Sequence, residues 1–228
     1  MNLLAYRHEY KHTINILDYH ALRQRIKNIA IPDSNAGTDG CYHIRSLYFD
    51  NEEDKALREK LYGLPHREKY RIRLYNGNEK FIRLEKKSKT GGLCNKQITT
   101  LSKAQTERIL ARDINWMAQS SDAVLVEFYG KLCSERLQPK TLVDYWREAY
   151  IYPYGNVRIT FDFDIRTGVY ATGIFDQNTP TIRISEPGIL LLEVKYDNFL
   201  PDIIRDLIQT NTRHTHAFSK YAACRVYG

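Results

Sequence analysis

Cysteine is scarce and scattered in this sequence. The four cysteines, Cys41, Cys94, Cys133 and Cys224, lie far apart, and no pair has Cys-x-x-Cys spacing or a matching pair of histidines. This pattern argues against a zinc knuckle and against a disulfide framework. Unpaired cysteines are typical of the reducing cytosol, so we expect a cytoplasmic protein.

Long apolar runs are absent as well. The longest candidate, residues 189–192, is far shorter than the ~18 residues of a membrane helix, and residues 1–9 lack the apolar stretch of a secretory signal. We therefore expect no membrane insertion of this chain. Apolar residues still make up 43% of the sequence, which suits a folded domain. Because repeats and linkers are also missing, residues 1–228 are interpreted as a single domain.

No block of consecutive basic residues forms a tail or an arm, although Lys and Arg (34) outnumber Asp and Glu (27) and give a net charge of +7. The basic residues are instead placed singly within segments that have the pattern of strands. The net charge indicates an acidic partner, and only the distribution of the basic residues can indicate whether this is nucleic acid, lipid or phosphate.

Alternating and turn-bounded segments predict a mostly antiparallel β structure with helices over it, an α+β fold. The Asn-Gly turn at residues 76–78 marks a hairpin, and Asp18 is expected to cap the first helix. The expected strands are residues 4–14, 42–49, 69–75, 80–88, 94–100, 141–150, 156–164, 181–184 and 189–196. The expected helices begin near residues 18, 50, 102, 122, 201 and 219.

Charged residues recur at every second position along five of these strands, so they share one face of each strand. They are Arg7, Glu9 and Lys11; Lys69, Arg71 and Arg73; Arg83, Glu85 and Lys87; Arg158, Asp162 and Asp164; and Glu193 and Lys195. For any single strand, a solvated face is the simpler interpretation. Five such strands, each mixing cations with few carboxylates, favour an interior lined with charge if the helices cover the apolar faces. Such an interior needs a polyanion, and its carboxylates suit a divalent metal.

Eight motifs occur in a fixed order along the chain. They are Arg7-His8-Glu9-Tyr10-Lys11, Arg45-Ser46-Leu47-Tyr48-Phe49-Asp50-Asn51, Tyr70-Arg71-Ile72-Arg73, Leu84-Glu85-Lys86-Lys87, Tyr145-Trp146-Arg147-Glu148-Ala149-Tyr150, Arg158-Ile159-Thr160-Phe161-Asp162, Leu192-Glu193-Val194-Lys195 and Phe218-Ser219-Lys220-Tyr221. In this order the sequence resembles the vacuolar transporter chaperone (VTC) polyphosphate polymerase domain. That family belongs to the triphosphate tunnel metalloenzymes, a CYTH-like superfamily whose fold is an antiparallel eight-stranded β-barrel with covering helices.

The resemblance implies an activity and a set of site residues. Eukaryotic members of the family make inorganic polyphosphate from ATP with a divalent metal, commonly manganese, so Mn²⁺ or Mg²⁺ is the implied cofactor. The implied phosphate ligands are Lys11, Arg71, Arg73, Arg83, Lys87, Lys96, Arg147, Arg158, Lys195 and Lys220. Glu193 is the implied metal ligand, and Glu9 and Glu85 are weaker candidates for binding metal or water or for orienting lysines. Of these, Lys11, Arg71, Arg73, Lys87 and Glu193 are the expected catalytic residues.

One position departs from the wider superfamily, whose first strand usually reads Glu-x-Glu-x-Lys. Arg7 occupies the first Glu position, which favours the polymerase branch and leaves one carboxylate fewer for a second metal. The chain has no Walker loop. We therefore expect the cations of a barrel wall to hold ATP or polyphosphate while the terminal phosphate of a growing chain attacks the γ-phosphorus and ADP leaves.

Three alternatives remain open from the residues. A tripolyphosphate or nucleotide triphosphate hydrolase would use the same scaffold with water as the nucleophile, and a non-catalytic polyphosphate-binding module would use the same cations. Nucleic acid is disfavoured as a partner, because a closed interior excludes a duplex. The resemblance also allows a separate membrane protein as a partner. The pair His214 and His216 is interpreted as part of a solvated loop rather than as metal ligands.

Overall fold

One antiparallel sheet dominates the computed structural model, which describes residues 6–209 and 218–226. Eight strands follow one another across it, each bonded to the next. In spatial order they are β1 (His8–Asn15), β10 (Ile189–Tyr196), β8 (Val157–Thr167), β7 (Gln138–Tyr152), β3 (Cys41–Asp50), β4 (His66–Tyr75), β5 (Ile82–Thr90) and β6 (Leu93–Leu101). Two short strands lie off this path: β2 (Ile31–Pro32) pairs with β7, and β9 (Ile182–Arg183) pairs with β8.

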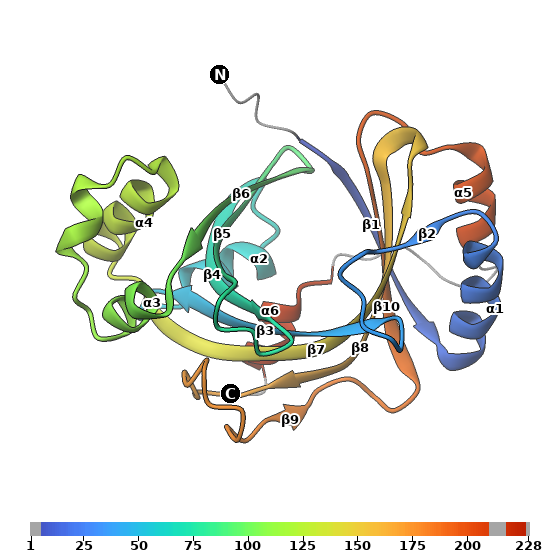
Figure 1. The fold of residues 1–228 in the computed structure, drawn as a ribbon. Helices are drawn as coiled ribbons and strands as arrows, with labels where there is room; N and C mark the ends of the chain where they lie inside the picture. Colours follow the sequence, from blue (N-terminus) through green and yellow to red (C-terminus); the bar gives the residue numbers. More distant parts are fainter. Residues whose placement is uncertain (1–5, 210–217, 227–228) are drawn as a thin grey trace.

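The sheet curves so strongly that its two outer strands approach each other (Figure 1). Just before β1, Arg7 exchanges two backbone hydrogen bonds with Cys94 of β6, with N–O distances of 2.9 and 3.2 Å. The predicted α+β barrel of eight antiparallel strands is therefore confirmed. Its closure rests on this isolated bridge rather than on a full ladder.

Helices pack on the outside of the curved sheet in two groups (Figure 1). The helices α3 (Lys103–Leu110) and α4 (Ala123–Ser134), with η1 (Asn115–Gln119), cover the apolar side of the β4–β5 hairpin. The helices α1 (Ile16–Lys27) and α5 (Asp202–Ile208) cover the apolar side of β8 and β10. Since the apolar faces lie under these helices, the charged faces of the same strands point into the barrel, as predicted.

The helices α1, α3 and α4 each begin at a side-chain cap, and the cap of α1 corrects the prediction. The cap of α1 is Asn15, whose Oδ1 accepts a hydrogen bond of 2.8 Å from the backbone N–H of Asp18. The Asp18 carboxylate accepts a hydrogen bond from the Asn15 backbone N–H, which forms the second half of a capping box. The predicted cap was therefore wrong by three residues, because either member of a capping box resembles a cap in the sequence.

The short helices α2 (Lys55–Leu61) and α6 (Lys220–Val226) are tied together by Asp50, which is fully buried. Its carboxylate accepts hydrogen bonds from the backbone N–H groups of Ala56 and Leu57 and from the Tyr221 hydroxyl, the last at 2.6 Å. Tyr221 also stacks on Tyr48, with a distance of 5.0 Å between ring centroids. The C-terminal helix therefore packs against inward-facing residues of β3. A further 3-10 turn, η2 (Tyr154–Asn156), joins β7 to β8.

Within the described residues, no helix has the length and apolar character required to cross a bilayer.

Candidate functional site

Cations outnumber carboxylates inside the barrel. The cations are Lys11, Lys69, Arg71, Arg73, Lys87, Lys96, Arg147, Lys195 and Lys220, and the carboxylates are Glu9, Glu85, Asp162 and Glu193. All of the sequence-predicted site residues except Arg83 and Arg158 belong to this set, which we call the lumen cluster. Lys69 and Asp162 complete it.

Glu85 of β5 is the centre of one half of the lumen cluster and is 1% exposed. Its Oε2 lies 2.6 Å from an Nη of Arg71 and 3.5 Å from an Nη of Arg73, and its Oε1 lies 3.0 Å from Lys96 Nζ. Burial opposes ionisation of this carboxyl, but the three cations hold its pKa well below the usual range. Because both of its oxygens contact cations, Glu85 is placed to orient them.

Glu9 of β1 and Glu193 of β10 face each other in the other half of the cluster. Lys11 Nζ lies 3.6 Å from Glu9 and 3.4 Å from Glu193, and Lys195 Nζ lies 3.6 and 3.3 Å from the same two carboxylates. Lys87 is bound to Glu9 at 2.9 Å. Burial opposes ionisation of both glutamates, yet the lysines outweigh it and hold both pKa values below their ordinary range. Both groups are therefore carboxylates at neutral pH.

Asp162 of β8 joins two cations that come from different elements. It binds Arg147 of β7 through two hydrogen bonds and lies 2.5 Å from Nζ of Lys220 in α6. Burial works against ionisation of Asp162, but Arg147 and Lys220 lower its pKa to about 2. Tyr145 links this group to Glu85, since its hydroxyl accepts a hydrogen bond of 3.0 Å from Arg73 and the Lys220 ammonium lies 4.7 Å from its ring centroid.

Lys69 and Tyr48 are site residues that were not among the implied ligands; Tyr48 lies within one of the motifs, whereas Lys69 lies outside all of them. Tyr48 accepts a hydrogen bond of 2.6 Å from Arg71, and the Lys69 ammonium lies 5.5 Å from the centre of its ring. Burial opposes ionisation of the Tyr48 phenol, but Arg71, Lys69 and Arg73 outweigh it and lower the pKa to about 7. The sequence did carry a signal for Lys69, because it alternates with Arg71 and Arg73 on one strand face.

Arg83 and Arg158 lie opposite Arg73 and Lys195 in the strand register, but their side chains contact residues outside the lumen cluster. The Arg83 guanidinium covers the ring of Phe81, with a distance of 4.4 Å to the ring centroid. Arg158 donates hydrogen bonds to Asp33 at 2.6 Å and to the Tyr42 hydroxyl at 2.7 Å. Their roles as phosphate ligands stay predictions.

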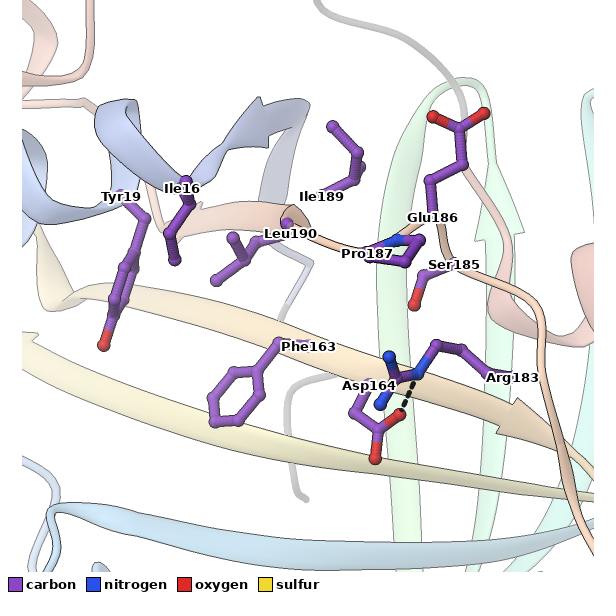
Figure 2. Close-up of a pocket in the computed structure, with 11 residues that line it drawn as sticks. Ile16, Tyr19, Phe163, Asp164, Arg183, Ser185, Glu186, Pro187, Ile189 and Leu190 are labelled. Carbon is purple, nitrogen blue, oxygen red and sulfur yellow. Dashed lines mark hydrogen bonds and ion pairs between the residues drawn. The ribbon is translucent and has the colours of Figure 1, made fainter.

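The alternation predicted that Arg7 and Asp164 lie on inner strand faces. Their side chains instead bind partners outside the lumen cluster. Arg7 pairs with Asp197 at 2.8 Å, beyond the end of β10. Asp164 has a left-handed backbone with φ of 47° next to a break in the β7–β8 register, and such an irregularity interrupts the alternation. Its side chain binds Arg183 at 2.6 Å in a second, largely apolar cavity that also includes Tyr19 and Phe163 (Figure 2).

The lumen cluster opens to solvent through a cavity of about 690 Å³, a volume that includes the space at its mouth. Lys11, Lys69, Lys87 and Ser219 belong to its lining. Further lining residues are Lys60, Arg67 and Lys89. A large anion therefore has a mainly cationic entrance from solvent to Lys11, Lys69 and Lys87 of the lumen cluster.

The donor set suits one divalent metal. Mg²⁺ and similar ions are bound in phosphate sites by one or two carboxylates together with phosphate oxygens, and the facing carboxylates of Glu9 and Glu193 supply that number. No group of three or more His, Cys, Asp or Glu side chains is placed to hold a metal in the described part of the chain. The pair His214 and His216 lies outside the described residues.

Comparisons with known proteins agree with this architecture. Among solved structures, the putative adenylyl cyclase from Hippeastrum, which has a dominant triphosphatase activity, is similar with a TM-score of 0.56 and 11% identity over 98% of this chain and 96% of that one. A putative adenylate cyclase from Bacillus halodurans has a TM-score of 0.47 and 15% identity over 89% and 87% of the two chains. At 11% identity, the likeness to the Hippeastrum protein concerns the fold alone. A search of curated proteins found no match.

A family profile gives the more direct assignment. The profile described as VTC domain matches residues 6–227, nearly the whole sequence. The motifs that carry the resemblance all lie within this range, and seven of them contribute residues to the lumen cluster. The chain belongs to the VTC domain family.

Proposed function

We propose that this protein, acting as a single domain over residues 1–228, synthesises polyphosphate from ATP and releases ADP. The observation that carries the proposal is the excess of cations over carboxylates in the lumen cluster. Buried cations without counter-charges are costly, and a polyphosphate or the triphosphate of ATP supplies several negative charges at once.

The catalytic roles follow from the contacts. Arg71 and Arg73, oriented by Glu85, and Arg147, oriented by Asp162, would hold the triphosphate and neutralise charge as it develops on the transferred group. Lys11, Lys87 and Lys220 would bind the neighbouring phosphates. An oxygen of the chain's terminal phosphate attacks the γ-phosphorus, and the bond from that phosphorus to the β,γ-bridging oxygen breaks. ADP leaves with the electron pair of that bond.

Glu193 and Glu9 would hold a divalent metal, Mn²⁺ or Mg²⁺. When bound, the metal supplies Lewis-acid charge neutralisation and a template for the phosphates. Lys11 and Lys195, which contact both glutamates, keep these two groups ionised and available as ligands.

Hydrolysis of a triphosphate is the second candidate, and the fold shared with the Hippeastrum triphosphatase favours it. The test is incubation of the purified protein with ATP and Mn²⁺ or Mg²⁺, followed by separation of products on a gel and assay of free phosphate. Long phosphate chains with stoichiometric ADP support the polymerase. Free phosphate without chains supports the hydrolase, and no turnover with retained binding of tripolyphosphate supports a non-catalytic binding module.

A matched control keeps this test specific. Lys103 is an exposed lysine paired with Glu79 on the outside of the barrel at 2.7 Å, so Lys103→Met should behave as wild type. Arg73→Met should abolish chain synthesis.

We further propose a cytoplasmic location and a separate membrane protein as partner, for which co-purification from detergent-solubilised membranes is the test.

A further inference from the structure

Large apolar side chains are exposed in the segment between α2 and β4. Leu61, Tyr62 and Leu64 are 60%, 77% and 43% exposed, and all of residues 61–66 are exposed. A single exposed leucine is ordinary, but exposed apolar side chains that cluster mark a surface with a partner. None of the three belongs to the lumen cluster, so the proposed function does not explain them.

The end of α2 holds these side chains in place. The N–H of Gly63 donates to the carbonyl of Lys60 at 3.3 Å, and the N–H of Leu64 donates to the carbonyl of Glu59 at 3.0 Å. The two bonds form a Schellman motif, for which Gly63 adopts a left-handed φ of 69°. The apolar side chains therefore project from an ordered helix end, so little conformational entropy is lost when a partner covers them.

Two further loops present aromatic side chains at the same end of the barrel. Tyr154 of η2 is 69% exposed, and Phe199, between β10 and α5, is 58% exposed. The loops that carry them lie at the upper end of the barrel in Figure 1, as does the turn between β5 and β6. We call the five exposed side chains the rim patch: Leu61, Tyr62, Leu64, Tyr154 and Phe199.

Backbone and ion-pair contacts join these loops at one end of the barrel. Arg7, which is bridged to the start of β6, donates through its guanidinium to the carbonyl of Asn156 and pairs with Asp197 at 2.8 Å. The N–H of Gly91, in the turn before β6, donates to the carbonyl of Pro65 at 3.3 Å. The segment after α2 and the two aromatic loops are therefore linked to each other through the start of β6 and the turn before it.

Basic residues lie beside the rim patch. Lys60, Arg67 and Lys89 line the cavity through which the lumen cluster opens to solvent. Burial, together with the charges of Arg67, Lys11 and Lys89, lowers the pKa of Lys60. Apolar and aromatic side chains next to lysines and arginines are typical of proteins that lie in the interfacial layer of a membrane, and anionic headgroups attract each basic residue near the surface.

A protein partner fits this surface less well than a lipid surface does. Protein interfaces bury a central apolar core from which lysine is depleted, whereas the rim patch is divided among three loops and has lysines beside it. We propose that the rim patch docks on the surface of an anionic phospholipid bilayer. Its five side chains would enter the interfacial layer, while Lys60, Arg67 and Lys89 contact the headgroup phosphates.

Docking of this kind needs no membrane-spanning segment. It turns the mouth of the lumen cavity towards the membrane, where the proposed membrane partner would meet the product. The inference goes beyond the proposed function, since docking requires neither ATP nor turnover.

Sedimentation of the purified protein with lipid vesicles, without nucleotide, tests the proposal. Wild-type protein should bind vesicles of phosphatidylcholine mixed with phosphatidylglycerol more tightly than vesicles of phosphatidylcholine alone, and added salt should weaken this binding. Tyr62→Ser and, separately, Phe199→Ser should each weaken binding to the mixed vesicles about tenfold, which corresponds to about 1.4 kcal/mol. Both variants should bind tripolyphosphate as wild type does, because neither residue lies in the lumen cluster.

Leu17→Ser is the matched control. Leu17 is 75% exposed, but it lies in α1, which follows the opposite end of β1 from Arg7. This variant should bind the mixed vesicles as wild type does. The basic residues are left unchanged in the test because they also line the cavity proposed to admit phosphates.

Three results would overturn the proposal. Absence of binding to the mixed vesicles at low salt would mean that lipid is not the partner, since the vesicles contain no protein. Unchanged binding of Tyr62→Ser and Phe199→Ser would mean that charge alone attracts the protein. A wild-type dimer that both variants convert to a monomer, measured by light scattering, would make the rim patch an interface between copies.

Melting temperatures of the variants separate these results from misfolding. If the vesicles bind but ATP yields no chains, the proposed polymerase fails and the docking surface stands. If chains form but the vesicles do not bind, the docking surface fails and the polymerase stands.

Discussion

Asp162 binds the guanidinium of Arg147 side-on, with 2.6 Å from Nε to Oδ1 and 2.8 Å from Nη2 to Oδ2. The same carboxylate lies 2.5 Å from the ammonium of Lys220. One fully buried acid therefore fixes two proposed phosphate ligands, one from a barrel strand and one from the C-terminal helix. Bidentate pairing of this kind fixes direction as well as charge.

Asp162→Asn should lower kcat by roughly 10- to 100-fold, because small displacements of positioned groups have effects of that order. Binding of tripolyphosphate should be retained or strengthened, since the substitution removes a negative charge from a cationic site. Steady-state kinetics and calorimetry check the two halves of this prediction. A parallel loss of affinity and turnover would assign Asp162 a purely structural role.

Glu85→Ala should destabilise the free protein, because it leaves Arg71, Arg73 and Lys96 without their shared counter-charge. Removing one partner from a buried charge group costs about 3 to 5 kcal/mol, so the melting temperature should fall by roughly 10 °C. Saturating tripolyphosphate should reduce the difference in melting temperature between the variant and wild type, because the ligand replaces the lost negative charge. Glu79→Ala, at an exposed ion pair, is the control and should shift the melting temperature little.

Much of this site follows from the two-residue period of strands. Alternation alone placed Glu9, Lys11, Arg71 and Glu193 on inner faces, and helices cover the opposite faces as expected. It failed for Asp164, where a left-handed residue beside a register break turns the side chain outward. A single sequence gives no signal for such a break.

The partners of each charge could not be predicted, because they depend on contacts between distant segments. Lys87 meets Glu9, 78 positions away, only because the barrel brings β1 and β6 together at the Arg7–Cys94 bridge. Insertion of the C-terminal helix, which brings Lys220 to Asp162, likewise depends on packing against Tyr48. The motifs predicted which residues gather in the lumen but not which of them bind one another.

Glu193→Gln and Glu9→Gln should each reduce metal-dependent turnover roughly 100-fold if both carboxylates hold the metal. Affinity for Mn²⁺ in the presence of tripolyphosphate, followed by electron paramagnetic resonance, should fall in parallel. Binding of tripolyphosphate with EDTA present should not weaken, because the metal plays no part there. Unchanged Mn²⁺ affinity in both variants would refute the assignment of the metal ligands.

The stability of the free protein should depend on pH through three lysines of the lumen cluster. Burial is the main cause that lowers the pKa of Lys69 and Lys96 to about 7 and that of Lys195 to about 8. Unfolded lysines keep their protons to about pH 10.4, so the unfolded chain binds more protons between about pH 7 and 10. These three residues should therefore reduce stability most below pH 7, and their penalty should shrink as the pH rises.

Bound polyphosphate should raise the lowered pKa values of these lysines, because a polyanion favours the charged form of each lysine. Binding at pH 8 should therefore take up protons, and affinity should fall as the pH rises from 7 towards 9. Calorimetry in HEPES and in Tris, whose ionisation enthalpies differ, measures the uptake directly. Lys69→Met should reduce it and Lys103→Met should not. Identical heats in the two buffers would show that the lysines already carry their protons in the free protein, and the excess positive charge of the lumen cluster would then be larger still.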